Sequence, residues 1–219
     1  TTLPDFGGGS RVWVKTVAGG KPFPIGGNET LQDAPTWSPR GDWIAYLSGG
    51  KGEKVTLVKS RVGDRGAPVR LAEDRIPPFV VRPRWSPDGD WVLCETFEGL
   101  SVIAADGSLR SHVLAETGWL AYAWDTDGTP VYGLLPSDDS RQFTLVSIDV
   151  PSGKRRVIND HLGSIPQALQ PLRGFSRMRS GGFLTSIAHV RSDIYLLEGF
   201  RLPRKWWERV WSFGHATQP

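Results

Sequence analysis

The sequence contains very little cysteine and no long apolar segment. Cys94 is the only cysteine among the 219 residues, which excludes an internal disulfide and leaves the redox compartment open. It lies in an alternating apolar run, so we interpret it as a small buried residue and not as a nucleophile. No run of 18 or more apolar residues occurs, so the sequence predicts no transmembrane segment.

The residues that build most catalytic and metal sites are sparse and scattered. The four histidines show neither His-x-x-x-His nor Glu-x-x-His spacing, which would place two metal ligands on one face. There is no Gly-x-Ser-x-Gly nucleophile motif and no suggested Cys/His pair. We therefore expect no catalytic residue, no metal and no cofactor in this chain. The histidines are His112, His161, His189 and His215.

The net charge is small but unevenly distributed. The formal net charge is +3, yet residues 151–219 hold 11 Lys/Arg against 4 Asp/Glu, whereas the remaining residues hold 15 against 19. A basic segment of this kind can meet an acidic partner, a phosphate-rich surface or the acidic part of its own chain. We favour the simpler interpretation, which is solvated arginine on a β-surface.

Glycine, proline and tryptophan are abundant. The chain has 26 Gly, 17 Pro and 10 Trp, a combination that suits many tight turns and favours short strands over helices. Its length allows one large all-β domain or two small ones.

One stretch combines turn residues with strand residues. Residues 86–89 read Ser-Pro-Asp-Gly and fit a type I turn, because Ser caps the first position, Pro fixes φ at the second, and Gly takes the left-handed position that ends it. Trp85 precedes the turn and Trp-Val-Leu at 91–93 follows it. These residues favour a pleated surface, so the stretch predicts a β-hairpin.

The same pattern recurs along the chain. Residues 35–46 are nearly a copy of residues 83–94, with Trp37 48 residues before Trp85, and residues 123–132 are a looser copy, 39 residues further on. Residues 175–184 are a decayed fourth copy. A period of roughly 40–50 residues with strand-rich content is typical of propeller blades.

The repeat predicts an all-β fold, a β-propeller of four-stranded antiparallel blades with about four to five blades present. In the second unit, for example, we expect strands at 80–85, 91–97, 100–105 and 111–114. We expect a flexible N-terminal segment at 1–10, blades over 11–200 and an aromatic, basic tail at 201–219. The expected blades are 11–27 (partial), 28–72, 73–115, 116–158 and 159–200 (partial).

The partial units at the two ends do not complement each other. The first supplies a third and a fourth strand and the last supplies a first, second and third, so both ends offer a third strand. We therefore predict that the chain is part of a longer propeller, with a five-bladed ring of irregular closure as the alternative. No signal peptide is recognisable and the chain begins with Thr1 rather than methionine, so we expect a leader or an upstream domain to be missing.

The repeated turns resemble a known family. Trp-Ser-Pro-Arg-Gly at 37–41 and Trp-Ser-Pro-Asp-Gly at 85–89 resemble the TolB-like (WD-like) β-propeller repeat, in which this motif joins the first and second strands. The resemblance covers roughly residues 11–200. It implies a bacterial, non-enzymatic scaffold or sensor, and a periplasmic or extracytoplasmic location. The same repeat also occurs in propellers attached to prolyl-oligopeptidase-type peptidases, so the fold does not fix the function.

Ligands of propellers usually bind at the mouth of the central channel, in the loops that enter the innermost strands. These loops are expected at 28–35, 74–81, 116–120 and 160–170. The candidate binding side chains there are Asp33, Arg82, Trp119 and His161.

The C-terminal tail has a different character. Trp207 and Trp211 lie at i and i+4, so a short amphipathic helix is conceivable and could lie in a membrane interface. We favour a tail that packs on the propeller rim or on missing blades, with contacts through Trp206, Trp207 and Trp211.

Three functions remain open from the sequence. The leading hypothesis is a binding module with a protein partner, or with a small ligand at the channel mouth. The alternative is the propeller portion of an enzyme, either a prolyl-oligopeptidase-type peptidase or a carbohydrate-active enzyme, with catalytic residues outside this chain. A nucleic-acid or anionic-surface role for the basic C-terminal third is disfavoured, because the chain has no known binding motif.

Overall fold

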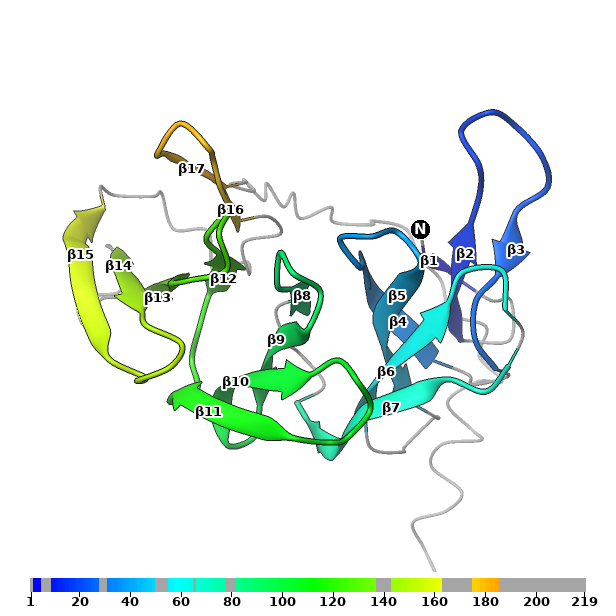
Figure 1. The fold of residues 1–219 in the computed structure, drawn as a ribbon, viewed down its shortest axis with the longest axis horizontal. Coiled ribbons are helices and arrows are strands. Elements are labelled where there is room, and N and C mark those ends of the chain that lie inside the picture. Colours follow the sequence, from blue (N-terminus) through cyan, green and yellow to red (C-terminus); the bar gives the residue numbers. More distant parts are fainter. Residues whose placement is uncertain are drawn as a thin grey trace, which may run out of the picture. The chain divides into compact units, whose positions relative to one another are not determined.

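The computed structural model describes residues 2–4, 9–27, 31–49, 55–64, 66–77, 82–136, 143–162 and 175–185. The chain divides into two compact units, residues 1–188 and 189–219, and all described residues belong to the first. Every regular element in this part of the chain is a β-strand (Figure 1). None of the described elements is a helix with the length and apolarity needed to cross a membrane.

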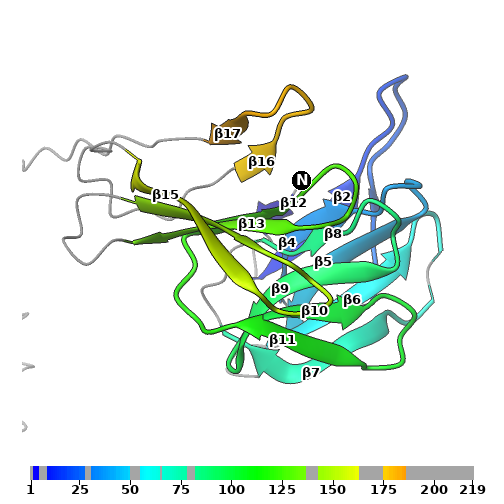
Figure 2. The same cartoon turned by 60° about the vertical axis from the view of Figure 1, so that its left-hand side comes forward.

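Three four-stranded antiparallel units follow one another in chain order, and we call them the first, second and third blades. Strand β4 and its equivalents β8 and β12 come first in each set, and we call them the inner strands. The first blade contains β4 (Leu31–Trp37), β5 (Trp43–Gly49), β6 (Val55–Arg61) and β7 (Val69–Ile76). The second contains β8 (Arg84–Trp85), β9 (Trp91–Thr96), β10 (Gly99–Ala104) and β11 (Ser111–Ala115). The third contains β12 (Ala121–Trp124), β13 (Val131–Pro136), β14 (Phe143–Ile148) and β15 (Arg155–Leu162), visible side by side in Figure 2.

Shorter sheets lie before and after these blades in the sequence. The N-terminal sheet contains β1 (Thr2–Pro4), β2 (Ser10–Val14) and β3 (Phe23–Pro24), with β2 antiparallel to both neighbours. A single parallel pair, Ser10 with Leu31, joins it to β4. At the other end, β16 (Phe175–Arg177) and β17 (Phe183–Thr185) form an antiparallel hairpin. Strand β1 lies in the segment 1–10 that we expected to be flexible, where no strand was predicted from the sequence.

Successive sheets pack face to face, with a buried apolar cluster at each junction. One buried cluster joins Leu57 and Leu71 of the first blade to Val92 and Ile103 of the second. Corresponding clusters join the N-terminal sheet to the first blade, the second blade to the third, and the third to the C-terminal hairpin. Each blade is apolar on both faces, so burial of one face requires a neighbour. The all-β propeller fold is therefore confirmed.

Tryptophan links neighbouring blades through the main chain. Trp85 Nε1 donates a hydrogen bond to the carbonyl of Thr36 (3.1 Å), and Trp124 Nε1 donates to the carbonyl of Arg84 (3.0 Å). In both cases the acceptor immediately precedes the repeat tryptophan of the preceding blade. The repeat tryptophan thus connects each blade to the one before it.

The turn of the C-terminal hairpin shows how the fourth copy aligns with the others. Gly181 N donates to the carbonyl of Met178, as Gly89 N donates to the carbonyl of Ser86 in the second blade. Met178 therefore occupies the serine position, and Arg177 occupies the tryptophan position. Arg177 lies against the rings of Tyr132 and Phe183, so a cation replaces the indole at this junction.

Several predictions fall outside the described residues. They are the tail at 201–219 with Trp206, Trp207 and Trp211, and most of the loop at 160–170. The boundaries of the individual blades, the number of blades and the continuation into a longer propeller stay predictions.

Candidate functional site

The candidate site is formed by the turns between the first and second strands of adjacent blades. In the second blade, Ser86 Oγ accepts a hydrogen bond from Trp91 N (2.9 Å) and donates to Asp88 Oδ1 (2.5 Å). Asp88 Oδ1 also accepts from Asp90 N (3.0 Å). Because Ser86 is buried and bonded on both sides, the turn is fixed from within, and its carboxylates face outward from a rigid support.

The first blade repeats this turn with one change. Ser38 Oγ accepts from Trp43 N (3.0 Å) and donates to Asp42 Oδ1 (3.0 Å). Arg40 occupies the position that Asp88 has in the second blade. Ser38 therefore bonds to the carboxylate of Asp42, two residues after Arg40. The substitution gives the first turn a cation at its tip and the second turn an anion.

The turns of adjacent blades pack in register. Gly89 adopts φ +84° and lies next to Pro39. A methyl group on its α-carbon would lie 3.6 Å from Pro39 Cδ. Gly128 of the third blade faces Pro87 of the second in the same way, at 3.8 Å. The left-handed φ that ends each turn favours glycine, and a methyl group at either position would make only ordinary van der Waals contact with the proline.

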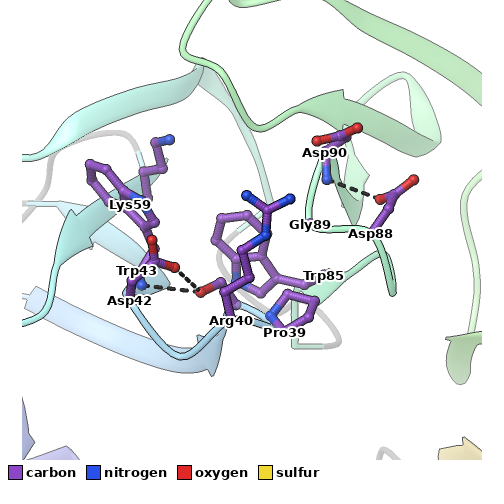
Figure 3. A pocket seen from close by; sticks show the side chains of 10 residues that line it. Pro39, Arg40, Asp42, Trp43, Lys59, Trp85, Asp88, Gly89 and Asp90 are labelled. Carbon is purple, nitrogen blue, oxygen red and sulfur yellow. Dashed lines mark hydrogen bonds between the residues drawn. The ribbon is translucent and has the colours of Figure 1, made fainter.

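A groove opens between the first and second turns. It comprises two adjoining hollows of about 110 Å³ and 460 Å³, which share Lys59, Gly89 and Asp90. Figure 3 shows Lys59 and Arg40 of the first blade on one side and the carboxylates of Asp88 and Asp90 on the other. The smaller hollow is lined by Ser38, Pro39, Arg40, Asp42, Trp43, Lys59, Trp85, Asp88, Gly89 and Asp90, and the larger one adds Trp91, Ala105, Asp106 and Arg110.

Tryptophan rings hold two of the cations in the groove. Lys59 Nζ lies 4.1 Å from the ring centroid of Trp43, and the Arg110 guanidinium lies 5.7 Å from that of Trp91. Both distances allow a cation–π attraction. Arg110 also forms an ion pair with Asp106 (2.9 Å), so its position is fixed from two sides.

The surroundings shift the pKa of several charged groups in the groove. Partial burial lowers the pKa of Lys59, and the carboxylates of Asp106 and Asp42 oppose this effect. The hydrogen bond from Ser86 lowers the pKa of Asp88, and the main-chain bond from Asp90 N adds to it. The pKa of Asp106 is lowered mainly by hydrogen bonds from Ser108, with a further contribution from Arg110. Both carboxylates are therefore ionised at neutral pH.

The charged and aromatic side chains of the groove suit the binding of another molecule. Three cations, four carboxylates and half-buried indoles face one rigid groove, so a ligand can find hydrogen-bonding, ionic and apolar contacts at fixed positions. Within the described ranges, no group of three or more His, Cys, Asp or Glu side chains is arranged to hold a metal ion.

The four residues expected at the channel mouth lie on separate segments of the chain. Asp33 is exposed on β4 and accepts a hydrogen bond from Ala34 N (2.7 Å). Arg82 is exposed just before β8. Trp119 is only 4% exposed and donates from Nε1 to the Glu116 carbonyl (2.6 Å), so the structure gives it a packing position. His161 is part of β15. A ligand-binding role for these residues stays a prediction.

The groove residues Lys59, Trp43 and Arg110 were not predicted as candidates from the sequence. The proximity of Lys59 and Trp43 could have been predicted, because Trp43 begins β5 and pairs with Arg61, the last residue of β6. Antiparallel pairing therefore brings the turn and the end of the third strand to the same end of the blade. No local sequence pattern indicated that the second blade would contribute Arg110 to the groove.

No protein-family model matches the chain, and no curated protein matches it either. Solved structures do resemble it. TolB from Acinetobacter baumannii superposes with a TM-score of 0.51 at 14% identity, covering 69% of this chain and 38% of that one. A protein assigned as TolB from Agrobacterium tumefaciens gives 0.48 at 18% identity, covering 69% and 51%. The periplasmic gluconolactonase PpgL of Pseudomonas aeruginosa gives 0.46 at 20% identity, covering 82% and 56%.

At 14% identity, the likeness to TolB from Acinetobacter baumannii supports the propeller fold alone. The chain spans 38% and 51% of the lengths of the two TolB structures.

Proposed function

We propose that this chain is a non-catalytic recognition module that binds a protein partner through the groove between its first and second turns. The observation that carries the proposal is that Lys59 and Arg40 line the same tryptophan-lined hollows as Asp88 and Asp90. A polypeptide can satisfy both walls at once, because it presents basic, acidic and apolar side chains along one strand or helix.

Rigidity supports this function. The serine hydroxyls bond both sides of each turn, so little conformational freedom remains to be lost when a partner binds. The tryptophans are half-buried, which gives large apolar contacts at the centre of the groove, as in the energetically important parts of protein interfaces.

Site-specific photo-crosslinking tests the proposal in cells of the source organism. A photoreactive side chain at Arg40 should capture a partner in the groove. The matched control is the same side chain at Glu98, an exposed residue of the turn between β9 and β10, at the opposite end of its blade. We expect a product from position 40 that position 98 does not give.

The captured partner is then purified and titrated by calorimetry. Lys59→Glu should weaken binding by about tenfold or more, because it reverses a charge in the groove, whereas Glu98→Lys should leave the affinity unchanged. A partner that crosslinks equally from both positions, or that binds Lys59→Glu as well as the wild type, would contradict the proposal.

The alternative function, the propeller portion of a peptidase or a carbohydrate-active enzyme, stays a prediction with which the fold is compatible.

A further inference from the structure

The repeat tryptophans make the same contact at two successive junctions. Trp85 and Trp124 each donate from Nε1 to a main-chain carbonyl on the inner strand of the preceding blade. Each of them pairs with the residue seven positions later, Trp85 with Val92 and Trp124 with Val131. The contact is therefore a property of a fixed position in the blade.

Trp37 occupies that position in the first blade but lacks the contact. It pairs with Ile44, also seven residues later, so its register equals that of the other two tryptophans. Its side chain is 51% exposed, whereas Trp124 is 8% exposed. Within the described residues no hydrogen bond from Trp37 Nε1 is formed. An indole equivalent to two interblade donors is thus left in solvent.

Among the described residues, no strand of the N-terminal sheet stands where the acceptor would be. Strand β3 leads directly to the inner strand β4, as β7 leads to β8 and β11 leads to β12, so β3 corresponds to an outer strand. It follows that β2 corresponds to a third strand and β1 to a second strand. The element not found in the described part of this sheet is the inner strand, which carries the acceptor carbonyl in the first and second blades.

We propose that Trp37 and the edge of β1 that pairs with no described strand form a docking surface for the inner strand of a further blade. The occupant is the polypeptide that directly precedes β1 in the same protein, because every complete blade runs from its inner to its outer strand in chain order. A main-chain carbonyl of that strand accepts a hydrogen bond from Trp37 Nε1. This continues an established series of interblade contacts by one member.

Physical chemistry favours such an occupant. A half-exposed indole leaves apolar area in water that the equivalent tryptophans bury. An unpaired strand edge presents free main-chain N–H and C=O groups, which propellers normally protect by pairing. One added strand satisfies both features, since it pairs with β1 and brings its carbonyls beside Trp37.

Hydrogen exchange of the indole N–H groups, followed by NMR, tests the proposal. The 219-residue chain is compared with the natural polypeptide extended upstream by one repeat, about 50 residues. We expect the Trp85 and Trp124 indole protons to be protected in both. The Trp37 proton should exchange rapidly in the 219-residue chain and become protected in the extended one.

The other outcomes overturn the proposal and identify the true occupant. Protection of Trp37 in the 219-residue chain at every concentration would show that residues of this chain cover it. Protection that increases with concentration would show that a second copy covers it. Rapid exchange in both polypeptides would show that nothing accepts the bond.

A conservative substitution gives an independent measurement. Trp37→Phe keeps the aromatic ring and removes the donor, and Trp85→Phe is the matched variant at a junction already formed. In the extended polypeptide both should lower the folding equilibrium constant by about two- to tenfold. In the 219-residue chain only Trp85→Phe should do so, and equal effects of Trp37→Phe in the two polypeptides would contradict the proposal.

Discussion

The indole of Trp119 lies directly against the main chain of Gly133. A methyl group on Gly133 would stand 2.3 Å from Cζ3 of Trp119, a distance that two carbon atoms do not adopt. The loop before β12 is therefore closed onto β13 by a contact that requires glycine at this position. Trp119 is buried in the cluster between the second and third blades, where it packs rather than faces solvent.

Gly133→Ala should destabilise the fold by about 1–3 kcal/mol, because the methyl group forces the ring or the strand to move. Denaturant unfolding measures the effect. Gly66→Ala is the control, since a methyl group there would meet only the flexible side chain of Asp64, at 3.4 Å or more. Equal stability of the two variants would show that Trp119 does not pack on the strand as described.

Gln32 connects the N-terminal sheet to the first blade and should be essential for stability. Its fully buried carboxamide accepts from Val12 N (2.9 Å) and donates to the Ile25 carbonyl (3.1 Å). Gln32→Leu leaves both main-chain groups without this partner, so we expect a loss of about 2–5 kcal/mol in the free energy of unfolding. The exposed substitution Lys15→Leu should change the stability by less than about 0.5 kcal/mol, and a similar small effect at Gln32 would refute the role.

Ser86→Ala should change both the stability and the pKa of Asp88. The hydroxyl bonds Trp91 N and the Asp88 carboxylate, so its removal should cost about 1–3 kcal/mol and raise the pKa of Asp88 toward its ordinary value. In the wild type the folded-state pKa is lowered, so Asp88 contributes stability above its unfolded pKa, and this contribution is lost as the pH falls.

Carboxyl NMR titration and acid unfolding measure the two effects of Ser86→Ala. The variant should lose less stability than the wild type between neutral and acidic pH. Ser111→Ala, at an exposed position of β11, is the control. An unchanged Asp88 titration in Ser86→Ala would mean that the serine does not set this pKa.

Cys94 should be unreactive in the folded protein. It is fully buried, and desolvation raises the pKa of its thiol from 9.0 to about 12. A disulfide reagent at pH 8 should therefore label the unfolded chain rapidly and the native chain only as fast as it opens. Rapid labelling of the native protein would show that Cys94 is accessible.

The same shift predicts alkaline instability. The unfolded thiol releases its proton near pH 9, but the folded thiol retains it to about pH 12, so stability falls with pH across this interval. Burial also raises the pKa of Tyr122, which adds to the loss above pH 10. Cys94→Ala should be less stable at neutral pH because of the smaller side chain, and its stability should fall less steeply above pH 9. A slope equal to that of the wild type would remove Cys94 as the cause.

The sequence by itself determined the fold class and most of the repeated strands and turns, although not strand β1. The Ser-Pro-Asp-Gly turn is specified by four adjacent residues, and the expected strands of the second unit at 91–97 and 100–105 match β9 and β10. These features depend on local chemistry: turn residues set φ, and alternation with a period of two sets the buried face. Repetition of the pattern then indicated a propeller, because a sheet apolar on both faces needs like neighbours.

Only the tertiary structure determined which residues make contact between blades. It placed Arg177 at the tryptophan position of the fourth copy, buried Trp119 against Gly133, and brought Lys59 opposite Asp90 in the groove. These contacts join residues separated by roughly 15–50 positions, and no local pattern encodes them. Their partners are selected by the packing of one sheet against the next, which depends on side-chain volume and register at every junction.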